Sequence, residues 1–186
     1  MNQIGHSLKE EIEIIKLLAD KYSDDIDIDL YEPENIETIN SFEQSTGVSL
    51  PDELKEFYQL IGGFDSLMAY MQMWNLEDIK ERYHEGYCDW IEEGDSDKYI
   101  VLGSTGGGEY LLMEKANGNY LRYGDEGEVM NIPSIKDLMC WNIDSMYEQV
   151  SVLRKMIQSI IIFKEIQTVY KIYSEIAGEY YPPLQK

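Results

Sequence analysis

The sequence of 186 residues has few of the residues that build disulfide-linked or histidine-based sites. It contains two cysteines, Cys88 and Cys140, and two histidines, His6 and His84. Two cysteines cannot form the disulfide framework of a small secreted domain, and both fit a reduced interior. We therefore expect a cytoplasmic protein.

Long apolar stretches are also missing. The first twenty residues carry Glu10, Glu11 and Glu13 where a signal peptide needs an uninterrupted apolar segment. No part of the sequence approaches the roughly 18 consecutive apolar residues of a membrane-spanning helix. We expect no association with a membrane.

Basic residues are scarce as well. The chain has 15 Lys and Arg against 36 Asp and Glu, which gives a net charge of −21 at pH 7. The excess lies in residues 1–98, with 25 acidic and 7 basic residues, whereas residues 141–186 have five of each. Such a surface repels nucleic acid and anionic lipid, and attracts a basic macromolecule. Alternatively, the carboxylates only keep a solvated surface soluble.

Residues that could perform catalysis do not form a recognisable set. Adjacent carboxylates such as Glu92 and Glu93 are expected from the composition alone, whereas acid–base catalysis needs two carboxylates in unlike environments. A nucleophilic Cys or Ser needs a base, usually histidine, and only His6 and His84 are present. The sequence therefore favours a protein without catalytic activity.

Two motifs suggest a metal or a phosphate but do not complete a site. His84, Cys88 and Asp89 supply at most three ligands, whereas zinc sites usually have four. The glycine-rich segment 103–108 is followed by strand-like sequence and lacks the Lys of a phosphate-binding loop. We expect neither a metal nor a cofactor.

Helical periodicity dominates the first half of the chain. Apolar spacing predicts helices over 7–22, 33–46, 51–61 and 75–83. Ser7 and Asn75 are suited to N-caps, Pro33 to a first turn, and Gly47 to a left-handed C-cap. The segment 66–74 is expected to be extended, and the acidic segment around Ile28 is either a short strand or a loop.

The middle of the chain changes to short aromatic and branched runs. Four such runs, 99–104, 108–115, 118–124 and 127–132, are separated by glycine-rich turns and predict an antiparallel meander. A helix through 134–141 and a long helix over 144–177 are expected to follow. The long helix has little polar face, so it should pack on the sheet, on the N-terminal helix or on a second copy in a homodimer.

These elements predict an α+β fold in a single domain over residues 1–186. It has a central antiparallel β-meander flanked by N-terminal helices and a long C-terminal helix.

Two motifs in this order resemble the SUKH superfamily. Ile36–Glu43, Gly47, Leu50–Tyr58 and the pair Gly62-Gly63 are similar to its "I-x-x-F-E" helix, glycine, "L-P-x-x-[LY]-K-x-F" helix and glycine pair. Val101–Glu109 is similar to its sheet motif, "i-G-x-x-G-G-G-E". The resemblance covers about residues 33–142, so the helices 7–22 and 144–177 are additions to the family core. It implies that Phe42, Leu50, Leu54 and Phe57 are core residues.

The superfamily includes bacterial immunity proteins that neutralise toxins, often nucleases, and fungal cell-wall synthesis regulators and adaptor domains. The resemblance therefore implies a non-catalytic immunity protein that occludes the active cleft of a cognate toxin, which the charge suggests is basic. The alternative is a regulatory or scaffold adaptor that binds an endogenous protein.

Aromatic residues among carboxylates indicate where a basic protein would bind. We predict as contact residues Trp74, Asp89, Trp90, Glu92, Glu93, Asp95 and the motif carboxylate Glu109. Glu109 either fixes the glycine turn or faces the partner. The alternative for residues 81–97 is a solvated helix and loop whose aromatic side chains point inward.

Overall fold

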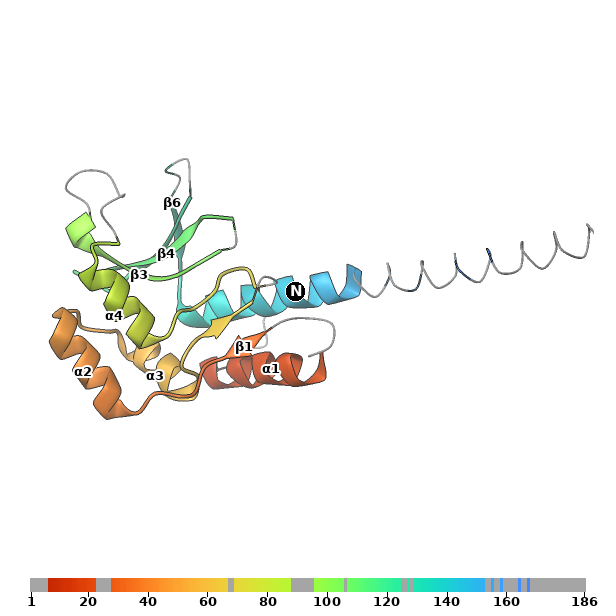
Figure 1. The fold of residues 1–186 in the computed structure, drawn as a ribbon, viewed down its shortest axis with the longest axis horizontal. Coiled ribbons are helices and arrows are strands. Elements are labelled where there is room, and N and C mark those ends of the chain that lie inside the picture. Colours follow the sequence, from red (N-terminus) through yellow and green to blue (C-terminus); the bar gives the residue numbers. More distant parts are fainter. Residues whose placement is uncertain are drawn as a thin grey trace, which may run out of the picture. The chain divides into compact units, whose positions relative to one another are not determined.

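The computed structural model describes residues 7–22, 28–66, 69–87, 96–105, 107–124, 127, 129–152, 155, 158, 164 and 167. The chain divides into two compact units, Met1–Tyr147 and Glu148–Lys186, which we call the first and second units (Figure 1). Among the described residues, every helix is too short or too polar to cross a lipid bilayer.

The first helix, α1 (Leu8–Lys21), begins at the predicted cap. The Ser7 hydroxyl accepts the N–H of Glu10 at 3.3 Å, and the Glu10 carboxylate accepts the N–H of Ser7 at 2.7 Å. This reciprocal pair satisfies N–H groups that a helix start leaves without partners. The apolar stripe of α1 is buried, and it consists of Leu8, Ile12, Ile15 and Leu18.

Helix α2 (Ile36–Thr46) starts later than its sequence suggests. Asn35 is the N-cap, because its side-chain oxygen accepts the N–H of Thr38 at 2.8 Å. The predicted start at Pro33 is therefore wrong. The predicted end is confirmed, since Gly47 follows α2 with a φ of 69°, in the left-handed region that glycine adopts readily.

Helices α3 (Asp52–Leu60) and α4 (Leu76–His84) complete the N-terminal half. In α4 the Asn75 side chain accepts the N–H of Asp78 at 2.8 Å, which confirms the predicted cap. The residues that the family resemblance implies as core are all buried; they are Phe42, Leu50, Leu54 and Phe57.

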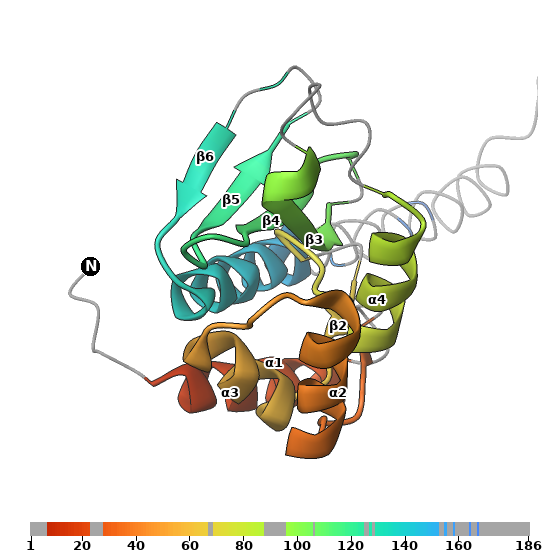
Figure 2. The ribbon, with the colours of Figure 1, turned by 90° about the vertical axis from the view of Figure 1, so that its left-hand side faces the viewer.

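The four predicted strands form an antiparallel meander in chain order. They are β3 (Tyr99–Ser104), β4 (Tyr110–Glu114), β5 (Tyr120–Tyr123) and β6 (Val129–Ile132), and a short helix, η1 (Ser96–Lys98), precedes them. Side chains alternate between the two faces of the sheet. One face is buried, through Ile100, Leu102, Leu111, Met113, Tyr120 and Ile132. Figure 2 shows α1, α2 and α3 grouped below the meander.

A second sheet pairs β1 (Asp29–Leu30) with β2 (Phe64–Asp65). Met73 extends it, because Met73 and Phe64 exchange two backbone hydrogen bonds of 2.8 and 3.0 Å. Of the segment 66–74 that was predicted to be extended, residues 72–74 are extended and residues 69–71 bend, whereas residues 67 and 68 lie outside the described residues.

The segment 72–74 also binds the edge of the meander. The N–H groups of Gln72 and Trp74 donate to the carbonyls of Ser104 and Leu102 in β3, at 2.8 and 2.9 Å. The two backbones approach so closely that a Cβ on Gly103 would lie 1.9 Å from the Gln72 carbonyl oxygen. The segment thus joins both sheets in one hydrogen-bonded layer.

A helix over residues 135–147 ends the first unit. Ser134 caps it by accepting the N–H of Asp137 at 2.9 Å. The predicted break between residues 141 and 144 is wrong, because residues 142 and 143 are helical. Asn142 does not end the helix, since its side-chain oxygen instead accepts the N–H of Met71 at 2.8 Å.

In the second unit, residues 148–152, 155, 158, 164 and 167 are helical, as predicted. The remaining positions of the predicted helix 144–177 lie outside the described residues. The first unit has the expected α+β architecture, with a central antiparallel meander and flanking helices.

Candidate protein-binding face of the sheet

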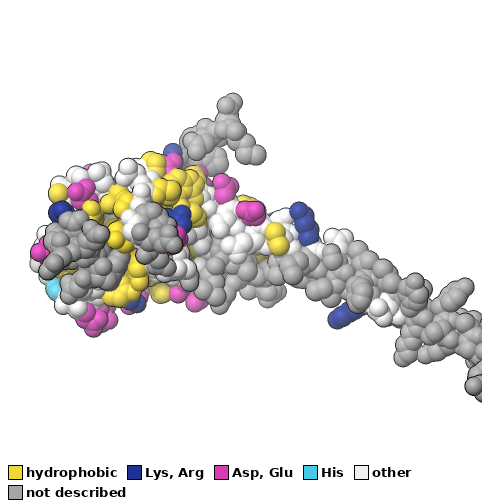
Figure 3. All heavy atoms as spheres, turned by 90° about the horizontal axis from the view of Figure 1, so that it is seen from above, with side chains coloured by type: hydrophobic (Ala, Val, Ile, Leu, Met, Phe, Trp, Pro, Cys, Tyr) yellow, Lys and Arg dark blue, Asp and Glu magenta, His cyan; other side chains and the backbone are white. Residues whose placement is uncertain are grey.

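The second face of the meander carries half-buried aromatic side chains. Val101 and Leu112 lie opposite each other on β3 and β4 and are buried. Six partly buried side chains pack against them, and we call this set the aromatic face: Trp74, Tyr87, Tyr99, Tyr110, Leu121 and Tyr123. Figure 3 shows hydrophobic side chains gathered over this part of the first unit.

Strand alternation and register bring the aromatic face together. Tyr110 lies opposite Tyr123, and Leu112 lies opposite Leu121, so all four share one side of the sheet. The repeated pattern of a tyrosine two residues from an apolar residue is visible in the sequence of β3, β4 and β5. Sequence reasoning missed these tyrosines because the pattern alone does not say which face the helices cover.

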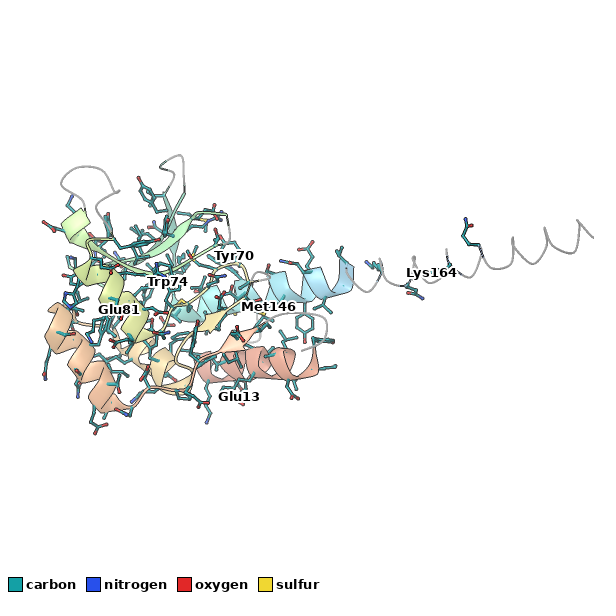
Figure 4. The ribbon with its side chains drawn as sticks, viewed as in Figure 1. Glu13, Tyr70, Trp74, Glu81, Met146 and Lys164 are labelled. Carbon is teal, nitrogen blue, oxygen red and sulfur yellow. The ribbon has the colours of Figure 1, made fainter. Side chains whose placement is uncertain are left out.

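Trp74 is held at this face by its backbone. Its N–H donates to Leu102, and its carbonyl accepts the hydroxyl of the fully buried Tyr58 at 3.1 Å. Burial raises the pKa of Tyr58 above its ordinary value, with smaller contributions from Tyr120 and Glu34, so this hydroxyl remains a donor. Figure 4 labels Trp74, which lies where the 72–74 segment meets β3.

The rings form a continuous series across three elements. The Trp74 and Tyr87 ring centroids are 5.8 Å apart at an interplanar angle of 70°, and those of Tyr87 and Tyr110 are 6.0 Å apart at 75°. These edge-to-face contacts are a favourable arrangement of aromatic rings. The series therefore presents a fixed, partly exposed aromatic surface.

Two cations lie against rings at or beside this face. The Arg82 guanidinium carbon is 4.2 Å from the Trp74 ring centroid and 5.1 Å from that of Tyr87. The Lys115 ammonium is 5.0 Å from the centroid of Tyr83, the residue after Arg82. These distances are within the range of cation–π attraction.

Of the predicted contact residues, the structure describes Trp74 and Glu109. Trp74 belongs to the aromatic face, where its indole is half-buried. Asp89, Trp90, Glu92, Glu93 and Asp95 lie outside the described residues. They occupy the sequence between Tyr87, at the end of the aromatic series, and η1.

Glu109 binds within the protein. Its carboxylate forms an ion pair with Arg122 of β5, and Arg122 also donates to the Tyr70 hydroxyl at 2.6 Å. The bond to Glu109 is the main cause that raises the pKa of Arg122. The backbone of Glu109 meanwhile closes the glycine-rich turn, because its carbonyl accepts the N–H of Thr105 at 2.8 Å.

Metal-ligating side chains are dispersed in the part of the chain that the structure describes. No three of its His, Cys, Asp and Glu residues come close enough to hold a metal ion. His84 contacts the ring of Tyr83 with a centroid distance of 5.7 Å. Cys88 and Asp89, its neighbours in the sequence motif, lie outside the described residues.

Comparison with known proteins identifies one family. The family model described as the SMI1 / KNR4 family (SUKH-1) matches residues 33–150, which is more than half of the chain. The match includes α2 through β6 and the whole of the helix over residues 135–147. No curated protein matches the chain.

Proposed function

Because the chain belongs to the SMI1 / KNR4 family (SUKH-1), we propose that it is a non-catalytic, cytoplasmic immunity protein. It binds a cognate bacterial toxin and neutralises it by occluding the active cleft. The proposed toxin is basic and of the nuclease type.

The observation that carries this proposal is the aromatic face. Binding energy at protein interfaces is concentrated in a few aromatic and arginine side chains set in well-packed surroundings. Trp74, Tyr87 and Tyr110 match this description, since they are packed edge to face yet partly exposed. Little ordering of these side chains is needed on binding, which favours affinity.

The net charge supports a basic partner. A charge of −21 raises the rate at which a cationic protein encounters this surface. The predicted contact carboxylates, among them Glu92, Glu93 and Asp95, follow Tyr87 closely in sequence. In the proposed mechanism they occupy the cleft where substrate phosphates bind, so inhibition requires no chemical step.

The proposal is tested by co-expression with the product of the adjacent reading frame. We expect the wild-type chain to restore growth and to co-purify with that product. The double variant Tyr87→Ala with Tyr123→Ala should weaken binding by about 10-fold or more, because it removes two rings of the aromatic face.

The matched control is Tyr147→Ala, which removes an exposed tyrosine that is not part of the aromatic face. It should leave rescue and affinity unchanged, and circular dichroism should show that all variants are folded. Absence of rescue by the wild-type chain, with binding to an endogenous protein instead, would support the adaptor alternative. Equal binding by the face variant and the control would remove the aromatic face from the proposal.

A further inference from the structure

Among the residues that the structure describes, Arg82 is a cation without a carboxylate partner, although the chain is strongly acidic. Ion pairs between described residues are formed by Lys16, Lys55, Lys80 and Arg122. Lys80 lies on the same helix as Arg82 and pairs with Glu77 at 3.2 Å. Within the described residues, no carboxylate lies within ion-pair distance of Arg82, whose contacts are instead the rings of Trp74 and Tyr87.

The position of Arg82 leaves its hydrogen-bonding capacity available. A guanidinium can lie flat on aromatic rings while the N–H groups at its edge bind a carboxylate through two parallel hydrogen bonds. The rings therefore hold the cation in place without using its donors. Arginine, tryptophan and tyrosine are also the residue types enriched among those that dominate binding energy at protein interfaces.

We propose that Arg82, seated on Trp74 and Tyr87, is the central contact for a carboxylate of the partner protein. This inference deepens the proposed function and rests on its assignment of the aromatic face as the binding site. The occupant is an Asp or Glu side chain that the partner presents within an otherwise basic surface. A second cation, Lys115, lies over the ring of Tyr83, the residue that follows Arg82 on the same helix.

The overall charge favours a protein carboxylate over a phosphate-rich ligand. At −21, the chain repels nucleic acids and anionic membranes, which carry many like charges. A basic protein with one acidic side chain at the contact is instead attracted at long range and oriented at short range. The two effects are separable, because steering governs association and a buried charged contact governs dissociation.

The local backbone fixes this arrangement in advance. Trp74 is bonded to Leu102 and Tyr58, and the N–H of Tyr87 donates to the Arg82 carbonyl at 2.9 Å. Gly86, with a φ of 73°, allows the chain to turn between them. A preformed site lowers the cost of ordering side chains on binding.

The test uses a phage-displayed library of random dodecapeptides, selected on the immobilised full-length chain. Peptides that require the aromatic face should contain an Asp or Glu. Their affinity, measured by calorimetry, should fall by about 10-fold or more in Arg82→Gln and by less in Arg82→Lys, which keeps the charge but not the planar fork. The control Lys80→Gln lies on the same helix and should bind like the wild type.

A second measurement does not depend on folding of the Arg82 variant. Changing the Asp or Glu of a selected peptide to its amide should lower affinity for the wild-type chain by a similar factor. Failure to enrich any peptide, enrichment of peptides without carboxylates, or equal binding by Arg82→Gln would overturn the proposal. Tighter binding by Arg82→Leu would show that the face is only apolar.

The result is distinguishable from failure of the proposed function. If the neighbouring gene product does not bind but Arg82-dependent acidic peptides do, the carboxylate site stands and the toxin assignment falls. If rescue occurs and Arg82→Gln rescues fully, the immunity function stands and the role of Arg82 falls.

Discussion

Two buried tyrosine hydroxyls on the helix side of the sheet differ in what they bind. Tyr58 donates to the Trp74 carbonyl, whereas the Tyr120 hydroxyl has no hydrogen-bond partner in the described part of the chain. Burial raises the pKa of both groups above the ordinary tyrosine value. Both hydroxyls therefore remain protonated, and they differ in whether the hydroxyl proton is donated in a hydrogen bond.

Removing the hydroxyl of Tyr58 and removing that of Tyr120 should have different effects on the free energy of unfolding. We expect Tyr58→Phe to lower the free energy of unfolding by about 1 kcal/mol, since it deletes a buried hydrogen bond and leaves the Trp74 carbonyl without this donor. Tyr120→Phe should leave the free energy unchanged or raise it, because it removes an unsatisfied buried group. Urea unfolding of the two variants measures both values, and a larger loss in Tyr120→Phe would contradict the assignment.

Cys140 should be slow to react at ordinary alkaline pH. Burial, followed by the charge and hydrogen bond of Glu11, raises the pKa of the Cys140 thiol to about 11 from 9.0. In a Cys88→Ser background, its rate of alkylation by iodoacetamide should therefore still be rising at pH 10. Glu11→Gln should lower the midpoint, and a rate that levels near pH 9 in the parent would show that the thiol is not perturbed.

The same shift has a consequence for stability. A thiol whose pKa is raised by folding contributes stability that is fully present below the unfolded value near 9. This contribution is lost as the pH rises through the folded value near 11. The thiol of Cys140 thus adds to the decline in stability over that range.

The N-terminus of the helix that begins at residue 135 is bound by a carboxylate from a distant element. Glu53 of α3 accepts the N–H groups of Ile135 and Lys136, both at 3.0 Å. A carboxylate at this end satisfies N–H groups without helical partners and interacts favourably with the helix dipole. It also joins α3 to the helix.

Substitution of Glu53 should destabilise the fold more than substitution of an exposed neighbour. We expect Glu53→Ala to lower the free energy of unfolding by about 1–2 kcal/mol, since it removes two charge-assisted hydrogen bonds. Glu56→Ala, an exposed position on the same helix, should change it by less than about 0.5 kcal/mol. Equal effects in a denaturant titration would show that the Glu53 contact does not stabilise the protein.

Elements with local signals were predictable from sequence. Ser7, Asn75 and Gly47 act on N–H or carbonyl groups a few residues away, and the glycine-rich turns separate the strands of the meander. The predicted break after residue 141 failed for a different reason. Asn142 is bound by Met71, 71 residues earlier in the chain, and such a contact leaves no local pattern.

The candidate site was less predictable. Trp74 was identified because aromatic residues and carboxylates occur together in its part of the sequence. Tyr99, Tyr110 and Tyr123 were not identified, because their common face depends on strand register. Glu109 was identified from a motif. That its carboxylate binds Arg122 follows from the pairing of β4 with β5, which the motif does not contain.

On the scale of the whole molecule, charge and contact surface have separate roles in the proposed interaction. The −21 net charge acts over distances comparable to the screening length, about 10 Å at 0.1 M salt. The aromatic face acts only at contact. Association should therefore depend on salt more strongly than dissociation does.

Reversing the charge of the acidic residues that we predict at the contact tests whether charge governs association. Glu92→Lys with Glu93→Lys should slow association with the adjacent gene product about 10-fold at low salt and flatten its salt dependence. The control pair Glu37→Lys with Glu56→Lys makes the same change in net charge on exposed positions of α2 and α3, and should slow it less. Stopped-flow kinetics at several salt concentrations measures both, and equal slowing would exclude a specific acidic patch.

The backbone of the 72–74 segment connects the aromatic face to the sheet formed by β1 and β2. Met73 exchanges hydrogen bonds with Phe64, while Trp74 on the next position is bonded to β3. Local opening that exposes the Trp74 amide to solvent deuterium therefore also disturbs the pairing of Met73 with Phe64. A partner that immobilises the indole would slow deuterium uptake at Phe64, so an amide remote from the contact would report occupancy.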